Sequence, residues 1–551
     1  MGSSLGPGPL LCGMLCHMSI NEERIQRHDY DVIVVGAGAA GVSAAIEAAD
    51  NGARVLLLDR NQGGGASALS GGVVYAGGGT AQQRAAGYED SVDNLFDYLR
   101  LEAGNAVDEA TLRQFCEESP GMIPWLESHG ARFEGSLAPY KTSYPTDDHY
   151  LYFSGNEKAY PYRQSADPAP RGHRTVAKGL ASGKTLWTVL HQAALARGVT
   201  FLPLARAEEL ILEHGKVAGV RYRVLEADHP NVAKQERLSR RTGKLGNWAP
   251  DLVSGVTRRI ESLWEDGAVA REARAAAVII SAGGFIYNRE MVQQHAPQFM
   301  DVSPLGTPAD DGSGIRLAVD AGGGVSHMDK VTAWRFLSPP SALIEGVTVG
   351  ANGRRILNED VYGATHGDAM VRRFDARGWA VYDADNWAKA RKQVMAQTQI
   401  FQKLQAGYLF SVGHKKAKTL DELAKKTGID AAGLTATVQA YNEGLESGAG
   451  DPAHKEPELC HPVRRAPFYA INISVKNAPF FPVPGLTLGG VRVQGDTGLV
   501  LHRDGGVIEG LYAAGRTAVG ICSNSYISGL SLADCIFSGR RAGRHAAPRR
   551  S

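Results

Sequence analysis

The stretch that decides the fold covers residues 30–60 and reads YDVIVVGAGAAGVSAAIEAADNGARVLLLDR. An apolar run ends at Val35, as in a parallel strand that is buried on both faces. A glycine-rich turn, Gly36–Gly41, follows directly, and a helix and the strand RVLLLD come next. This order predicts a strand, turn, helix and strand unit that binds a dinucleotide.

Each glycine of the turn has a separate expected role. Gly36 permits the tight turn, Gly38 lets the backbone approach a pyrophosphate, and Gly41 lets the helix pack closely on the strand. Asp59 closes the second strand at about the ~20-residue spacing of an acid that accepts from a ribose hydroxyl. A 2′-phosphate would be repelled there, and the choice between FAD and NAD stays open at this point.

Three further segments favour FAD. Residues 61–80, NQGGGASALSGGVVYAGGGT, are rich in glycine and serine, which suits backbone lying against phosphate and a planar ring. AAAVIISAGGF (275–285) and GGVIEGLYAAGRTAVG (505–520) each resemble a buried strand that runs into a glycine turn. We therefore expect an α/β fold, with a discontinuous Rossmann-type FAD-binding domain and an inserted α+β substrate-capping domain.

The expected boundaries follow from this pattern. The FAD-binding domain covers residues 30–300 and 476–545, and the catalytic capping domain covers residues 301–475. Residues 1–29 are interpreted as a disordered leader, and residues 546–551 as a basic tail within the solvated end GRRAGRHAAPRRS.

The composition excludes several classes of protein. Of 551 residues, 43% are hydrophobic and 21% charged, as in an ordinary globular protein. The 59 Lys and Arg residues balance 58 acids, so no overall charge would attract nucleic acid. No apolar run is long enough for a transmembrane helix, and six scattered cysteines suggest neither disulfides nor zinc. We expect a cytoplasmic protein without a metal site.

The motifs together resemble the flavoprotein family of fumarate reductases, succinate dehydrogenase flavoproteins and 3-ketosteroid dehydrogenases. Its markers are GAGAAG, GGGASALSGG, SAGGF, GRRILNED, LGGVRV and the ending GLYAAGR…GLSLADCIFSGRRAG. Fumarate reductases place arginines where this chain has Gly363 and Tyr526. Without two guanidinium forks, diacids become poor substrates.

Phenols stand in their place. Tyr362 in EDVYG, the YISG sequence that begins at Tyr526, and the segment 71–80 resemble motifs of the 3-ketosteroid Δ4-(5α)-dehydrogenases. The resemblance implies a steroid substrate, a separate electron acceptor, and transfer of the C5 hydrogen as hydride to flavin N5. It also implies that Tyr526 donates to the ketone, and that Ser528 and Tyr362 remove the C4 proton as a relay.

Such a relay requires a phenol pKa lowered from its ordinary value of about 10. The cofactor is expected to be non-covalent FAD, since no histidine adjoins the glycine-rich loop. Its predicted contacts are Gly36, Gly38, Ala39, Ala40, Gly41, Asp59, Arg60, Ser67, Ser70, Gly71, Gly72, Ala207, Ala282, Gly283, Gly515, Arg516, Gly529, Ser531 and Leu532.

Rival functions stay open at this stage. They are a steroid Δ1-dehydrogenase, a reductase of small enoates, and a flavin protein with a sensing or electron-carrying role. The oligomeric state also stays open, with a homo-oligomer as one alternative.

Four other segments have structural interpretations. Residues 226–275 form an insertion with an amphipathic helix around 252–263, interpreted as a packed surface helix, with a dimer contact or a weak membrane contact as alternatives. Residues 419–448 predict two short helices. We interpret Arg354 and Arg355 as structural, His366 as an exposed or a satisfied histidine, and the acids of ADDGSGI (309–315) as caps of the following helix.

Overall fold

The computed structural model describes residues 30–242, 250–476, 478 and 481–548. The prediction for residues 1–29 lies outside these ranges. In the part of the chain that they cover, no helix is long and apolar enough to cross a membrane.

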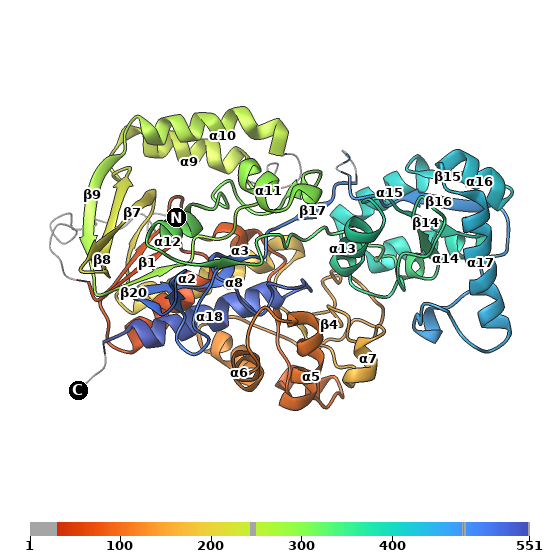
Figure 1. Cartoon of the computed structure of the whole chain (residues 1–551), viewed down its shortest axis with the longest axis horizontal. Coiled ribbons are helices and arrows are strands. Elements are labelled where there is room, and N and C mark those ends of the chain that lie inside the picture. Colours follow the sequence, from red (N-terminus) through yellow and green to blue (C-terminus); the bar gives the residue numbers. More distant parts are fainter. Residues whose placement is uncertain (1–29, 243–249, 477, 479–480, 549–551) are drawn as a thin grey trace, which may run out of the picture.

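A six-stranded sheet forms the centre of the FAD-binding part (Figure 1). Its strand order is β19-β20-β10-β1-β2-β6. The strands are β19 (Leu499–Leu501), β20 (Val507–Ala513), β10 (Ala277–Ile280), β1 (Val32–Val35), β2 (Val55–Leu58) and β6 (Thr200–Leu202). All neighbours are parallel except β19 and β20. Because β20 comes from the C-terminal segment, the discontinuous α/β fold is confirmed.

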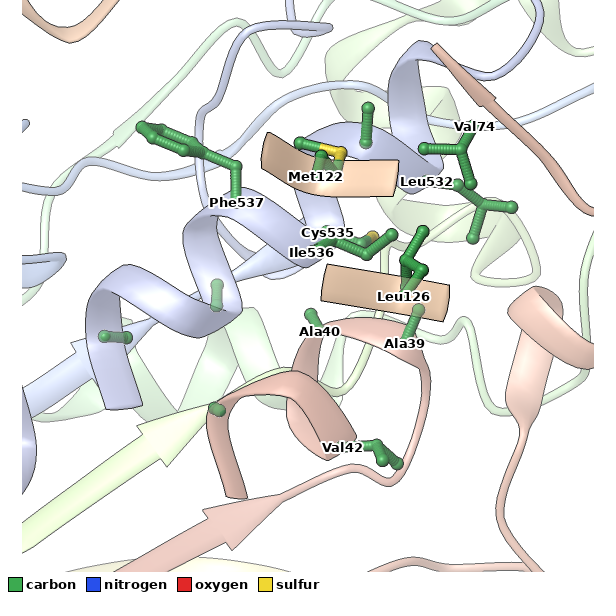
Figure 2. Close-up of a cluster of buried hydrophobic side chains, with 14 of the residues drawn as sticks. Ala39, Ala40, Val42, Val74, Met122, Leu126, Leu532, Cys535, Ile536 and Phe537 are labelled. Atoms are coloured by element: carbon green, nitrogen blue, oxygen red, sulfur yellow. The ribbon is translucent and has the colours of Figure 1, made fainter. Parts of the chain in front are cut away.

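The two helices beside this sheet approach each other closely. Helix α2 (Ala39–Asp50) packs against α18 (Leu530–Ala546), and Figure 2 shows apolar side chains of both helices meeting there. A Cβ at Gly539 would lie 2.2 Å from the Ala40 carbonyl oxygen, and one at Gly543 would lie 2.3 Å from that of Ala44. Glycine therefore sets the distance between the helices and places both N-termini at the same end of the sheet.

The end of the chain differs from the expected solvated segment. Arg540 pairs with Glu47, Arg544 pairs with Glu118, and Arg541 is only 4% exposed. The physical reason is that α18 continues to Ala546, so its arginines reach acids on α2 and on α6 (Glu109–Ser128).

The insertion 226–275 forms α9 (Pro230–Thr242), α10 (Pro250–Glu265) and β9 (Val269–Arg274). The predicted helix is therefore present. Strand β9 joins β7 (Ala205–Glu213) and β8 (Lys216–Val224) in an antiparallel sheet. Trp264 of α10 is buried and donates from Nε1 to the Leu204 carbonyl at 2.8 Å. This packing supports the interpretation of a packed surface helix.

The capping part contains a four-stranded antiparallel sheet in the order β13-β14-β16-β15, at the right of Figure 1. The strands are β13 (Val347–Val349), β14 (Trp379–Tyr382), β16 (Phe468–Asn472) and β15 (His414–Ala417). Its helices are α13 (Gly363–Arg373), α14 (Ala384–Gln397), α15 (Ile400–Ser411), α16 (Leu420–Thr427) and α17 (Ala431–Glu446). Helices α16 and α17 confirm the two predicted over residues 419–448.

Two short pairings connect the first residues of the expected cap to the returning chain. Strand β11 (Ser303–Pro304) pairs with β17 (Pro484–Gly485), and β12 (Val325–Ser326) pairs with β18 (Gly490–Val491). The proposed division at residues 300 and 475 stays a prediction. Strands β11 and β12 of the expected cap pair with β17 and β18 of the expected FAD-binding part.

Shorter elements complete the fold. The remaining strands are β3 (Val73–Tyr75), β4 (Leu151–Tyr152) and β5 (Gly172–Arg174), which form one small sheet. The remaining helices are α3 (Gly65–Leu69), α4 (Ala81–Ala85), α5 (Val92–Ala103), α7 (Tyr162–Ser165), α8 (Ser182–Ala196), α11 (Arg289–His295) and α12 (Ser313–Asp320). Short 3-10 turns cover Gly179–Ala181, Pro297–Phe299, Ser341–Ile344, Pro457–Leu459 and Gly515–Thr517.

Candidate active site

A cavity of about 410 Å³ lies between the central sheet and the cap. Three helices begin at its wall: Ala39 and Ala40 start α2, Ser313 starts α12, and Leu532 lies in the first turn of α18. Helix N-termini carry partial positive charge and free N–H groups, so this wall favours an anionic ligand such as a pyrophosphate.

Nearly all predicted cofactor residues line this cavity. They are Gly36, Gly38, Ala39, Ala40, Asp59, Arg60, Ser67, Ser70, Gly71, Gly72, Ala207, Ala282, Gly283, Gly515, Arg516, Gly529, Ser531 and Leu532. Gly41 lies behind the wall, where a Cβ would come within 1.8 Å of the Gly36 carbonyl oxygen. Its contribution is the close packing of α2, and it does not contact the cavity.

The conformation of the glycine-rich turn lets its main chain approach a cofactor. Gly36 has φ +103°, a conformation that residues with a side chain rarely adopt. A Cβ at Gly38 would meet only Ser67 Oγ, at 3.5 Å, so the space beside Gly38 is open to a ligand. Ser67 Oγ also accepts from the backbone N–H of Ala39 at 3.0 Å, which fixes the start of α2.

Asp59 occupies the position expected of the ribose acceptor. It is 9% exposed, lines the cavity, and accepts from the backbone N–H groups of Ala37 and Asn61, each at 2.8 Å. Burial raises the pKa of Asp59, and the backbone donors oppose that rise. The carboxylate is therefore held in place at the end of β2.

Two arginine–aspartate pairs close the cavity wall. Arg516 donates to Asp310 Oδ1 at 2.5 Å, and Arg60 donates to Asp311 at 2.7 Å. Asp311 also accepts from Ser313 N–H at the start of α12, as expected of a capping acid. Asp310 differs from that expectation because it pairs with Arg516 in the interior.

The donors of this wall fit FAD. Arg516 is buried, and its Nη1 has no hydrogen-bond partner among the described residues. A buried guanidinium nitrogen without a partner is costly unless a ligand accepts from it. The open space at Gly38, the three helix starts and this nitrogen form a set of donors suited to an anionic dinucleotide.

The three predicted catalytic residues meet at the other end of the cavity. Tyr362, Tyr526 and Ser528 all line it, although they come from the cap and from the loop before α18. The rings of Tyr362 and Tyr526 have centroids 6.3 Å apart. The fold thus brings together residues that are far apart in the sequence.

Tyr526 is held by its ring and has a free hydroxyl. Its ring lies 5.1 Å from that of Trp334, and Phe336 packs edge-on against Tyr362 at 5.3 Å. No hydrogen bond to the Tyr526 hydroxyl is formed within the described ranges. The hydroxyl of Tyr526 is thus available to an acceptor in the cavity.

Ser528 has a partner that the sequence did not reveal. Its Oγ lies 2.9 Å from the hydroxyl of Tyr152 on β4, and Ser528 lines the same cavity as Tyr362. Ser528 N–H donates to the Ser154 carbonyl at 3.2 Å, and Ser154 Oγ donates to the Ser528 carbonyl at 2.9 Å. The Ser528 hydroxyl is therefore held on a fixed backbone, bonded to Tyr152 and in the same cavity as Tyr362.

The pKa values of these phenols correct one expectation. Burial raises the pKa of Tyr362 well above its ordinary value, and the hydrogen bond to Ser528 opposes this only in part. Burial likewise raises the pKa of Tyr526 and of Tyr152. The expected lowered phenol pKa is therefore wrong for this structure, because the surrounding aromatic wall disfavours a phenolate.

The residues interpreted as structural lie outside the cavity. Arg355 pairs with Glu359 and Asp451, and Lys455 also pairs with Glu359 at 2.9 Å. His366 is buried with Nε2 2.9 Å from Thr348 Oγ1, and burial lowers its pKa to about 4. His366 lies near the start of α13, directly after Tyr362, so these contacts fix the backbone that carries Tyr362.

A diacid clamp is not formed at this site. Gly363 begins α13 at the position where fumarate reductases were expected to carry an arginine. Arg335, which does line the cavity, donates to the backbone carbonyls of Phe481 and Ser474. No group of three or more potential metal ligands occurs within the described ranges.

Comparison with known proteins places this geometry in a family. The model of the "FAD binding domain" family matches residues 31–529. The chain is 36% identical to the 3-oxo-5-alpha-steroid 4-dehydrogenase of Comamonas testosteroni, over 88% of this chain and 92% of that protein. The chain belongs to this FAD-binding flavoprotein family. Both the resemblance inferred from the motifs and the FAD cofactor are thereby confirmed.

Two further relatives agree with this membership. The crystal structure of 3-ketosteroid-delta4-(5alpha)-dehydrogenase from Rhodococcus jostii RHA1, in complex with 4-androstene-3,17-dione, matches with a TM-score of 0.80 and 31% identity, over 95% of this chain and 98% of that one. The 3-oxosteroid 1-dehydrogenase of Mycobacterium tuberculosis (strain ATCC 25618 / H37Rv) is 28% identical over 90% of this chain and 94% of that protein.

Proposed function

We propose that this flavoprotein introduces the C4–C5 double bond into 5α-3-ketosteroids. The observation that carries this proposal is the free hydroxyl of Tyr526 beside Tyr362 and Ser528 in one largely apolar cavity, with the Tyr152 hydroxyl 2.9 Å from Ser528 Oγ. The relatives that act on 3-oxo-5α-steroids support the same substrate class. A rigid apolar ring system with one ketone suits such a cavity.

Tyr526 would hold the ketone. Since burial raises the pKa of Tyr526, the phenol stays protonated at neutral pH and can donate its hydrogen to the carbonyl oxygen. Removal of the α-proton places negative charge on that oxygen, and a fixed donor stabilises it more in the transition state than in the bound ketone. The Trp334 ring, 5.1 Å away, keeps the donor in place.

Ser528 would receive the C4 proton and pass it on. Its hydroxyl can take a proton only while giving one up, and Tyr152, at 2.9 Å, and Tyr362 are the neighbours available. Because both phenols have raised pKa values, the relay works only when it loses a proton to solvent or to a base at its outer end. We therefore assign Tyr152 to the relay together with Tyr362 and Ser528.

Bound FAD supplies the acceptor for the hydride that leaves C5. The residues at the start of α2 would hold its pyrophosphate, and Asp59 would accept from its ribose. The arginine pairs with Asp310 and Asp311 close the wall beside these positions. The cap covers the other end of the cavity and excludes water from the steroid.

A Δ1-dehydrogenase is the second candidate, because a relative of that activity covers 90% of this chain. Incubation of the holoenzyme with a 5α-3-ketosteroid and, separately, with its 4-ene counterpart distinguishes the two, using an artificial electron acceptor. We expect the 4-ene product from the first substrate and no turnover of the second. Turnover of the 4-ene alone would reject the proposal.

We also propose a separate electron acceptor and a cytoplasmic location. Cys116, Cys460, Cys522 and Cys535 are free thiols, which fits a reducing compartment. Association into a homo-oligomer stays a prediction, which sedimentation velocity of the holoenzyme would test.

A further inference from the structure

Large apolar side chains are exposed along one side of the cap. Met395 is 72% exposed at the end of α14, Ile400 is 77% and Leu404 75% exposed on α15, and Val412 is 75% exposed just after α15. We call these four residues the outer apolar face. They are the most exposed large hydrophobic side chains of the described residues, and such clusters mark a contact with another apolar surface.

Helix α15 faces the cavity on one side and carries exposed apolar side chains on the other. Phe401, Gln402, Gln405, Ala406 and Leu409 line the substrate cavity. Ile400 and Leu404, spaced four residues apart, point away from that side at helical periodicity. Their exposed side chains belong to the outer apolar face, which lacks a partner among the described residues.

The chain around this face carries only positive charge. Residues 386–420 contain no Asp or Glu, and their seven Lys and Arg residues are Lys389, Arg391, Lys392, Lys403, Lys415, Lys416 and Lys418. Lys389 pairs with Glu345, whereas Arg391, Lys392 and Lys415 are exposed and form no ion pair among the described residues. This local charge contrasts with a net charge of +1 for the whole protein.

Exposed apolar and positively charged side chains also lie beside the cavity on the FAD-binding part. Leu69 and Leu180 line the cavity, and each is 42% exposed. Lys178 and Lys184 are exposed on either side of Leu180. Of two adjacent acids at this junction, Asp147 is bound by Arg174 at 2.7 Å and by Gln399 at 2.9 Å, and Asp148 is exposed. Exposed leucines and lysines thus lie on both the cap and the FAD-binding part.

We propose that the outer apolar face and the rim at Leu180 dock on an anionic lipid bilayer. Apolar side chains would enter the interface while the surrounding lysines and arginines contact lipid phosphates. The cavity, which Leu180 and Phe401 both line, would then receive its apolar substrate directly from the lipid. This last step rests on the proposed steroid function, whereas the docking itself does not.

Co-sedimentation of the FAD-loaded, full-length protein with vesicles tests the proposal. We expect binding to vesicles that contain phosphatidylglycerol, and little binding to phosphatidylcholine alone. Binding should fall when the ionic strength is raised to about 1 M, where the screening length shortens to about 3 Å. The double variant I400E/L404E should lower the partition coefficient by about tenfold or more.

A matched control is available on the far side of the FAD-binding part. Leu212 is 45% and Val507 43% exposed on β7 and β20, away from α15 in Figure 1. The variant L212E/V507E has the same change of charge and should bind vesicles like the unmodified protein. Neither pair lines the cavity, so turnover of cyclodextrin-delivered steroid should stay within about twofold in both variants.

Several outcomes would overturn the proposal. They are an unmodified protein that stays in the supernatant with anionic vesicles, equal binding by I400E/L404E, or a dimer in solution that I400E/L404E abolishes, which would make a second copy the partner of this face. If vesicle binding follows the prediction while no steroid reduces the flavin, the docking stands and the proposed function fails.

Discussion

Replacing Tyr526 by phenylalanine removes one hydroxyl and leaves the ring packing in place. The ring contacts with Trp334 at 5.1 Å and Tyr362 at 6.3 Å do not involve the hydroxyl, and that hydroxyl has no partner among the described residues. The unliganded fold should therefore lose little stability. The variant should instead lose stabilisation of the charge that develops on the ketone oxygen in the transition state. We expect the rate of this step to fall by about 10²–10³-fold, or about 2.7–4 kcal/mol.

Binding should change far less than the rate. A hydrogen bond between neutral groups is worth about 0.5–1.5 kcal/mol, so we expect the steroid dissociation constant to rise by no more than about tenfold. Anaerobic stopped-flow measurement of flavin reduction at increasing concentrations of a 5α-3-ketosteroid separates the limiting rate constant from this dissociation constant.

A second tyrosine serves as the control. Tyr469 is stacked on Trp387 with centroids 4.4 Å apart and does not line the cavity. Tyr469→Phe should leave the limiting rate within about twofold. The reasoning is refuted if Tyr526→Phe slows flavin reduction by less than about threefold, or if Tyr469→Phe slows it equally.

Three other outcomes are expected. Since the relay phenols have raised pKa values, the limiting rate of flavin reduction should rise by about tenfold per pH unit between pH 7 and 10. Ser528→Ala or Tyr152→Phe should slow the reaction and flatten this slope. A flat profile in the unmodified enzyme would contradict the relay. Gly38→Ala should fold, because its Cβ meets only Ser67 Oγ at 3.5 Å, but it should release flavin on gel filtration. The control Gly121→Ala, with open space around its Cβ, should retain flavin. Equal flavin content in both variants would argue against the predicted contact. Burial lowers the folded-state pKa of His366 to about 4, below its ordinary value, so the unfolded chain binds the proton more readily. The free energy of unfolding should therefore fall by about 1.4 kcal/mol per pH unit as pH drops from roughly 6.5 to 4. Urea unfolding of His366→Gln should show a weaker fall, and an unchanged pH dependence would exclude this histidine as the cause.

Local sequence patterns predicted the FAD-binding part well. The turn at Gly36 and the helix after it depend on neighbours within a few residues, so the sequence alone carries their signal. Strands β1, β2 and β10 are continuous apolar runs, as parallel buried strands require. The cap has shorter strands and an antiparallel sheet, and its order could not be read from the chain.

The site was predicted unevenly for a physical reason. Tyr362, Tyr526 and Ser528 were found because their motifs resemble those of a known family, and the fold does bring them together. Tyr152 was missed because a tyrosine on a two-residue strand carries no local signal, and its contact with Ser528 joins positions 376 residues apart. The sequence led us to expect a lowered phenol pKa, whereas burial raises the pKa of Tyr362. This burial comes from aromatic side chains that only the fold brings together, so no local sequence pattern shows it.

The central sheet has a consequence for how the enzyme is made. Strand β20 lies beside β10, and α18 supplies one wall of the cofactor cavity, yet both are synthesised long after the turn at Gly36. The nucleotide half-site at Gly36 is synthesised first but cannot close until residues beyond 500 arrive. Flavin loading is therefore expected only after β20 and α18 have been synthesised, and nascent chains halted before β20 should be colourless.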